Sequence, residues 1–392
     1  MRRLFQRPIT VLSILLIIMG VLAFMPKVEK NVSTDTKPDK GKKAAESTPF
    51  VKHDADPQKN IPYGNWENHT TKDGLPSNKV FCVKADGNQI WAGTDAGLAH
   101  LIDGKWTIYT EDDGLAHNGV LSLDVSPVTG DLWIGTMGGL SKFSGGQFET
   151  YTQFNSGLAN DIIYQVTCDD KEVWVATGGG ASRYDTYSKE WSIFTQQNAP
   201  MHEPWTYGVT ASKEKVYIAA WGGGVIEYNK TTGNFRDYVD PDGEMELDLF
   251  PDDGLVHDIT TGVTYANDIL WVGTYFGLSR YDGVHWQGFF DDDSGLASNF
   301  INALKANGAV VWLCTDNGLS SFDGEHWITY RAFENESGGQ VISQKGGMIE
   351  TQTSNKSIAH NYVLGVDFMN DKVLLATSGG LSIGCLLYTS DA

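Results

Sequence analysis

Two tryptophans, Trp205 and Trp221, are the strongest candidates for binding chemistry in this chain. Ten of the twelve tryptophans recur at two fixed positions of a repeated unit, and these two do not. An aromatic ring offers a large contact area at a small entropic cost, so exposed rings bind sugars and apolar partners. Further aromatic residues follow in the same part of the chain: Tyr207, Tyr275, Phe276 and Phe300. We expect these six residues to line a ligand site; the alternative is that their rings fill the central channel of the fold.

Three histidines are expected near these rings. His202, His257 and His360 belong to units of the repeat whose loops we place on one face. Convergent imidazoles can hold a divalent metal, but these histidines lack the short spacing of a ligand motif. We therefore count the three histidines among the ligand-binding residues and predict no metal site and no cofactor.

No arrangement of residues indicates covalent catalysis. The sequence contains no phosphate-cradling loop, no nucleophile elbow and no credible Ser/His/Asp or Cys/His order. The acidic run from Asp240 to Asp248 lacks the spacing of an EF-hand and is interpreted as a solvated loop. We predict no catalytic residues, and an enzyme is the less favoured class.

The spacing of the other ten tryptophans predicts the strands that must position these residues. The first set lies in phrases such as 90–94 (IWAGT) and recurs every 41 or 42 residues between adjacent units; it consists of Trp91, Trp133, Trp174, Trp271 and Trp312. The second set lies in a later strand of the unit and consists of Trp66, Trp106, Trp191, Trp286 and Trp327. A period near 40 residues with several short strands is typical of a β-propeller blade.

Seven units can be counted. They begin near Gly74, Gly114, Gly157, Thr206, Gly254, Gly295 and Asn361. Each reads as four strands, a to d, with Tyr217 and Leu374 replacing the strand-b tryptophan in units four and seven. The chain opens with an unaccompanied strand d around Trp66 and ends with a strand c, so the first strand should complete the last blade and leave no open edge. We predict an all-β, seven-bladed β-propeller of four-stranded antiparallel blades.

Two of the loops between blades are expanded. About ten extra residues lie around 239–250 and about twenty around 332–355, and loops of that length usually carry function or are mobile. We expect the d–a and b–c loops to emerge on one face, around the channel. A polar pair precedes most a strands, as in Ser77-Asn78 and His257-Asp258, and is expected to cap its own turn.

Charge and hydropathy divide the chain into segments. The net charge is −20; residues 1–60 contribute 11 − 6 = +5, so the rest carries −25, which argues against binding nucleic acid. An uncharged stretch, 9–25, follows three arginines and predicts an uncleaved signal anchor within 1–26, although the lysines after it oppose export on a strict positive-inside count. We interpret 27–60 as a flexible linker, 61–384 as the propeller, and 385–392 as a sequencing artefact.

The repeat is similar to that of a known family. Stretches 73–80 (DGLPSNKV) and 90–98 (IWAGTDAGL) resemble the two-component regulator propeller repeat, and the resemblance extends over about 65–384, most strongly in units one, two, five and six. It implies an extracytoplasmic sensor that often recognises carbohydrates and commonly precedes a histidine kinase. This sequence departs from the pattern because it shows no kinase, receiver or DNA-binding segment and has its membrane segment before the propeller.

These observations favour one function over two others. The leading hypothesis is a membrane-tethered, extracytoplasmic sensor that binds a glycan or small molecule, with a signalling protein as a possible partner. One alternative is a propeller lyase or hydrolase with a histidine-bound metal. The other is a scaffold for protein interactions at the cell envelope.

Overall fold

Short strands joined by tight turns make up most of the chain that the structure describes. This computed structural model describes residues 60–241, 254–334 and 336–387. Within these ranges it has thirty strands and two 3-10 helices, η1 (Thr71–Asp73) and η2 (Glu111–Asp113). Turn glycines such as Gly97 and Gly139 have φ of 130° and 138°, which side-chain-bearing residues rarely adopt. The backbone conformation of the b–c turn therefore requires the glycine that recurs there.

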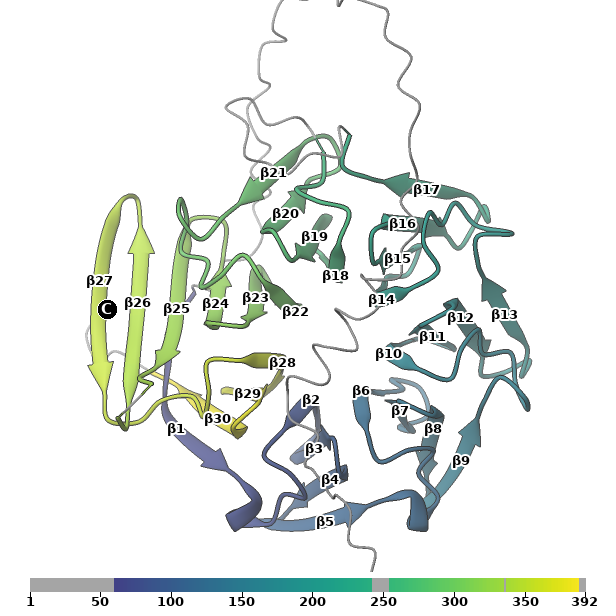
Figure 1. Ribbon diagram of the computed structural model, residues 1–392, viewed down its shortest axis with the longest axis horizontal. Helices are drawn as coiled ribbons and strands as arrows, with labels where there is room; N and C mark the ends of the chain where they lie inside the picture. Colours follow the sequence, from purple (N-terminus) through teal and green to yellow (C-terminus); the bar gives the residue numbers. More distant parts are fainter. Residues whose placement is uncertain (1–59, 242–253, 335, 388–392) are drawn as a thin grey trace, which may run out of the picture. The chain divides into compact units, whose positions relative to one another are not determined.

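Strands β2 to β25 form six blades in chain order, with the a strand of each innermost (Figure 1). Blade one has β2 (Val80–Asp86), β3 (Gln89–Thr94), β4 (Gly97–Ile102) and β5 (Lys105–Tyr109). Blade two has β6 (Val120–Val125), β7 (Leu132–Thr136), β8 (Gly139–Ser144) and β9 (Gln147–Tyr151). Blade three has β10 (Ile163–Asp169), β11 (Glu172–Thr177), β12 (Gly180–Asp185) and β13 (Trp191–Phe194).

The next three blades repeat this order. Blade four has β14 (Thr206–Ala211), β15 (Lys215–Ala220), β16 (Gly224–Asn229) and β17 (Phe235–Tyr238). Blade five has β18 (Thr260–Ala266), β19 (Ile269–Thr274), β20 (Leu278–Tyr281) and β21 (Trp286–Phe289). Blade six has β22 (Ile301–Asn307), β23 (Val310–Thr315), β24 (Gly318–Phe322) and β25 (His326–Ala332).

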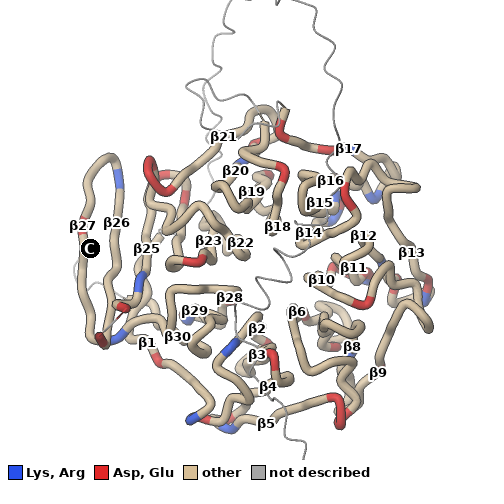
Figure 2. Tube along the Cα trace, viewed as in Figure 1, with Lys and Arg blue, Asp and Glu red and all other residues tan. Residues whose placement is uncertain are grey.

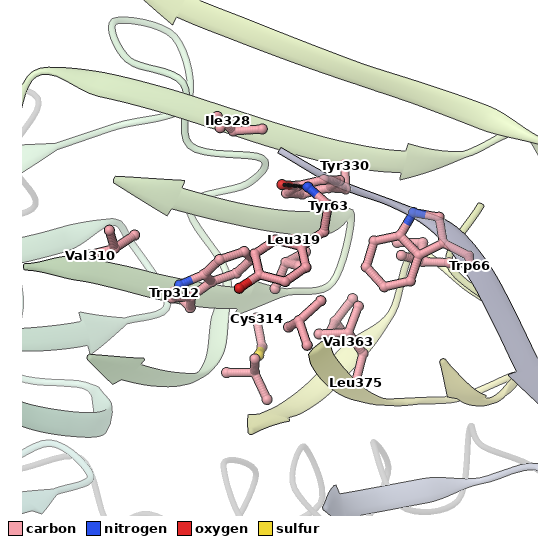
Figure 3. Close-up of a cluster of buried hydrophobic side chains, with 13 residues drawn as sticks. Tyr63, Trp66, Val310, Trp312, Cys314, Leu319, Ile328, Tyr330, Val363 and Leu375 are labelled. Carbon is pink, nitrogen blue, oxygen red and sulfur yellow. Dashed lines mark hydrogen bonds between the residues drawn. The ribbon is translucent and has the colours of Figure 1, made fainter. Parts of the chain in front are cut away.

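Blade seven is completed by the first strand of the propeller. β28 (Val363–Met369), β29 (Lys372–Thr377) and β30 (Gly380–Leu386) join β1 (Tyr63–His69) in one sheet of order β1-β30-β29-β28. Trp66 of β1 is 5% exposed, and its ring meets Tyr330 of blade six edge-on at 5.8 Å between centroids. Figure 3 shows both rings in the cluster of side chains beneath β1. The predicted seven blades and their closure around Trp66 are confirmed.

The inner strands form a ring around the central axis. Each inner strand contacts those of the neighbouring blades, in the order β2, β6, β10, β14, β18, β22, β28 and back to β2 (Figure 1). The hydrophobic clusters lie between adjacent blades, where one blade's strand-b tryptophan is buried against the next blade. The strand-b tryptophans are at most 6% exposed. They are packing residues, as their repetition suggests.

Blade six carries a hairpin that the sequence did not predict. β26 (Gly339–Lys345) pairs with β25, and β27 (Met348–Ser354) pairs with β26, so this sheet has six strands. The expansion at 332–355 is therefore ordered strand for most of its length. All seven residues of β27 are exposed, including Met348 and Ile349.

A β-bulge interrupts every inner strand after its first residue. Examples are the register shifts between Ile163 and Gln165 in β10 and between Thr206 and Gly208 in β14. A bulge re-aims the extra side chain and raises the local twist. Tyr164 and Tyr207 are the bulged residues in these two strands.

Several predictions made from the sequence concern residues that the structure does not describe. The signal anchor (1–26), nearly all of the linker (27–60) and the acidic run from 242 onward lie outside the described residues. Among the residues that are described, no helix is long and apolar enough to cross a membrane. β30 continues through Cys385 and Leu386, and the Leu387 amide donates to the Pro62 carbonyl at 3.0 Å.

Candidate functional site

Two positions of the repeat lie at the face of the propeller that carries the d–a and b–c loops, around the central axis. One is the residue just before an inner strand, and the other is the residue just after strand b of the same blade. In five blades the amide of the second donates to the carbonyl of the first at 2.8–3.3 Å; the pairs are Met137–Gly119, Gly178–Ile162, Trp221–Trp205, Asp316–Phe300 and Ser378–Tyr362. We call these two positions, in all seven blades, the axial frame. The same backbone bond thus holds the two frame residues together in each of these five blades.

Five aromatic rings from blades three to six form a continuous row. Tyr164 stacks on Tyr207 with centroids 4.2 Å apart, and Tyr207 lies 5.1 Å from Trp221. Trp221 meets Tyr275 edge-on at 4.7 Å. Tyr275 stacks on Phe300 at 3.6 Å with an angle of 20° between the planes. We call these five residues the aromatic row.

The structure thus brings together four of the six predicted aromatic residues. The two others lie apart from the row in their ring contacts. Phe276 stacks on His257 at 4.3 Å. Trp205 is partly exposed and contributes its backbone, since its carbonyl accepts from the Trp221 amide at 2.8 Å.

Tyr164 belongs to the row, although sequence reasoning did not select it. Its signal was available, because Tyr164 and Tyr207 occupy the same position one residue inside their inner strands. Burial raises the pKa of Tyr207, and the neighbouring Tyr164 adds to this effect. Burial likewise raises the pKa of Tyr275. Both hydroxyls therefore stay neutral at physiological pH and can donate hydrogen bonds.

The row is partly open to solvent. Trp221 is 8% exposed, whereas Tyr164, Tyr207, Tyr275 and Phe300 are all partly exposed. Trp221 is therefore the buried member of the row, while its neighbours Tyr207 and Tyr275 retain accessible surface. This arrangement suits a flat or apolar group placed against the rings.

The three predicted histidines do not converge. His202 is exposed and pairs with Asp237 of β17 at 3.1 Å. The Nδ1 atoms of His257 and His360 accept backbone hydrogen bonds from Ile259 and Tyr362 at 3.0 and 2.8 Å. No group of three or more metal-binding side chains occurs within the described ranges.

The hydrogen bonds of these two histidines have a chemical consequence. A neutral imidazole that accepts at Nδ1 carries its proton on Nε2, so Nε2 has no lone pair for a metal. Binding a metal through Nε2 would protonate Nδ1 and set it against the backbone N–H. Both histidines therefore serve as caps of the turns that precede their inner strands.

His257→Ser is expected to reduce the loss of stability on acidification. Burial lowers the pKa of His257 from its ordinary value of 6.5, so folding favours the neutral ring. This contribution is complete above about pH 6.5 and is lost as the pH falls through the lower pKa of the folded state. Serine fills this position in blades one and six, where Ser77 and Ser298 accept the equivalent amide bond. Unfolding temperatures at pH 7 and pH 5 measure the effect, and an unchanged difference between them would contradict it.

The Asn or Asp before the inner strand clamps the loop that leads to it. Its Oδ1 accepts a backbone amide from the end of the preceding strand d or from the start of the loop after it, at 2.7–2.9 Å in six blades. The residues are Asn78, Asn118, Asp161, Asp258, Asn299 and Asn361. The expected turn capping is thus observed, but it spans seven or more residues. Blade four has Pro204 instead, directly before Trp205, so this hydrogen bond is missing in the blade that supplies Tyr207 and Trp221.

Comparisons with known proteins support the architecture. No protein-family model and no curated protein matches the sequence. The extracellular domain of a putative hybrid two-component system from B. thetaiotaomicron has a TM-score of 0.64 at 18% identity, over 82% of this chain and 42% of its own. A second such domain from that organism has a TM-score of 0.59 at 17% identity, with 85% and 44% covered.

An enzyme shares the same fold. Virginiamycin B lyase from Staphylococcus aureus has a TM-score of 0.56 at 16% identity, over 84% of this chain and all of its own. The chain spans less than half the length of the two extracellular domains. Identities this low show the fold alone, and that fold agrees with the resemblance to the two-component regulator propeller repeat.

Proposed function

We propose that this propeller is an extracytoplasmic sensor domain that binds a ligand against the aromatic row. The extracellular domains of two-component systems with the same fold support this proposal. A glycan or a small organic molecule is the ligand class that the rings suit best. The proposal includes a signalling protein as partner and a membrane tether at 9–25, which lies outside the described residues.

The observation that most strongly supports this proposal is the continuity of the aromatic row across four blades. Five rings contact one another in sequence, and four of them are partly exposed, so together they form a platform for a ligand. Each favourable ring contact adds about 0.5–1.5 kcal/mol beyond the area that it buries. Two or three such contacts together add about 1–4.5 kcal/mol, which corresponds to roughly one to three powers of ten in Kd.

The alternatives receive less support from the geometry. A histidine-bound metal is disfavoured because His257 and His360 use Nδ1 as an acceptor of backbone bonds. The scaffold hypothesis stays a prediction. β27, with its exposed outer edge, is the surface that a protein partner could extend by strand pairing.

Tyr275→Ala is expected to weaken ligand binding at least about tenfold, because it removes the ring that joins Trp221 to Phe300. Glycan arrays and thermal-shift screening of the purified protein identify the ligand, and calorimetry then compares the variants. Phe154→Ala is the matched control, since Phe154 is 96% exposed and makes no ring contact with the described residues. Equal affinity of the Tyr275→Ala variant and the wild type would contradict the proposal.

A further inference from the structure

One carboxylate beside the aromatic row has no partner. Asp316 follows strand β23 in the axial frame, and its Oδ1 is buried without a hydrogen bond. Within the described ranges its side chain makes no hydrogen bond and no ion pair. A buried acceptor left unsatisfied costs about 1–3 kcal/mol, and more when it is charged. Such a group in a folded protein requires an explanation.

In blade one the aspartate at this position has a cation beside it. Asp95 follows β3 just as Asp316 follows β23, and its Oδ2 lies 4.0 Å from Nζ of Lys79. Lys79 is the blade-one residue immediately before the inner strand. In blade six Phe300 fills that position, so the axial frame keeps the acid and replaces its cation with an aromatic ring.

The surroundings of Asp316 are aromatic. Its amide donates to the Phe300 carbonyl at 3.3 Å, and Phe300 stacks on Tyr275. Burial raises the pKa of Tyr275, with the charges of Tyr362 and Asp316 adding to it; burial and then the charge of Asp316 raise the pKa of Tyr362. Asp316 therefore lies close enough to both tyrosines for its charge to act on their hydroxyl groups.

The basic side chains that flank Asp316 in the sequence are both engaged. Lys305 of β22 pairs with Asp367 at 2.6 Å. Arg331 of β25 donates from Nε to the Asn317 carbonyl at 3.1 Å and from Nη2 to the Ala297 carbonyl at 2.6 Å. Figure 2 shows acidic segments in the loops near β14, β18 and β23, so the charge around the row favours a cation (Figure 2).

We propose that Asp316 receives a protonated amino group of the ligand, held between this carboxylate and the rings of Tyr275, Phe300 and Tyr362. An ammonium group supplies both the missing donor and the missing charge, and charge-assisted hydrogen bonds are about twice as strong as neutral ones. Aromatic faces add cation–π attraction of about 0.5–2 kcal/mol. The inference rests on the proposed function, because it places the amine at one end of the same row.

Two matched pairs of probes test the amine, namely glucosamine against glucose and benzylamine against benzyl alcohol. Calorimetry or ligand-observed NMR at pH 6.5 on the full chain should show at least one amine binding about tenfold more tightly than its neutral counterpart. Asp316→Asn should abolish that preference. Asp95→Asn is the control at the same position of the frame and should preserve it. Benzyltrimethylammonium carries the charge without an N–H donor and should bind more weakly than benzylamine.

The outcomes separate this inference from the proposed function. Equal binding of amine and neutral probes, no binding of either amine, or an amine preference that survives Asp316→Asn overturns the amine site. If neutral glycans or glucose still bind and Tyr275→Ala weakens them, the aromatic row remains the ligand site and only the amine is wrong. If neither probes nor glycans respond to Tyr275→Ala, both proposals fail.

Discussion

Replacing Trp66 by alanine is expected to lower the free energy of unfolding by about 3–5 kcal/mol, the range for a buried tryptophan. The ring is 5% exposed, contacts Tyr330 edge-on and fills the space above Gly384, where an added Cβ would lie 2.7 Å from it. Its strand is also the one that closes the ring of blades. The substitution therefore weakens both a core cluster and the closure.

Chemical denaturation measures this loss, and Trp191→Ala is the matched control. Trp191 occupies the same strand-d position in blade three but is partly exposed and packs among residues of blades two and three, away from the closure. We expect its loss to be clearly smaller. Hydrogen exchange should show faster opening of β30 in the Trp66→Ala variant while β6 to β8 stay protected. Equal losses for the two variants would contradict a special role for closure.

Asp367→Ala is expected to destabilise the protein by about 3 kcal/mol, because it leaves groups of two other blades without a partner. Asp367 of β28 is 5% exposed. Its Oδ1 lies 2.6 Å from Nζ of Lys305 in β22, and its Oδ2 accepts the Ala85 amide of β2 at 2.8 Å. One carboxylate thus connects blades six, seven and one, on both sides of the closure.

The conservative variant Asp367→Asn separates charge from hydrogen bonding. It can keep the bond to the Ala85 amide and loses the ion pair, so its cost should fall between those of the wild type and Asp367→Ala. Lys305 is 38% exposed and can regain water, which holds the expected loss near the lower end of the range for buried pairs. A loss below about 1 kcal/mol for Asp367→Ala would contradict the bridging role.

The fold was predictable because its strongest signals are local and repeated. Tryptophan spacing reports strand position, and an unaccompanied strand around Trp66 has only one place to pair. The hairpin β26–β27 was interpreted as loop because it lacks the tryptophan pattern. Its signal was the pair Gly346-Gly347, whose φ of 56° and 81° suit the tight turn of a hairpin.

The candidate site was only partly predictable, for physical reasons. Off-repeat rings such as Trp221 stand out in a sequence, whereas Tyr164 looks like an ordinary strand residue. Asp316 matches the repeat and so appeared unremarkable; only the missing cation beside it sets it apart from Asp95. The Nδ1 bonds of His257 and His360 depend on backbone geometry that no spacing reveals.

The axial frame has a consequence for how such a protein can diversify. In five blades the backbone bond across the frame is kept whether the paired residues are glycine, tryptophan, aspartate or phenylalanine, so the side chains there differ without a change in this bond. These residues also stay outside the hydrophobic clusters between the blades. A library that varies only the ten positions of these five blades would therefore sample new recognition surfaces at little risk to folding, and natural paralogues could diverge by the same route.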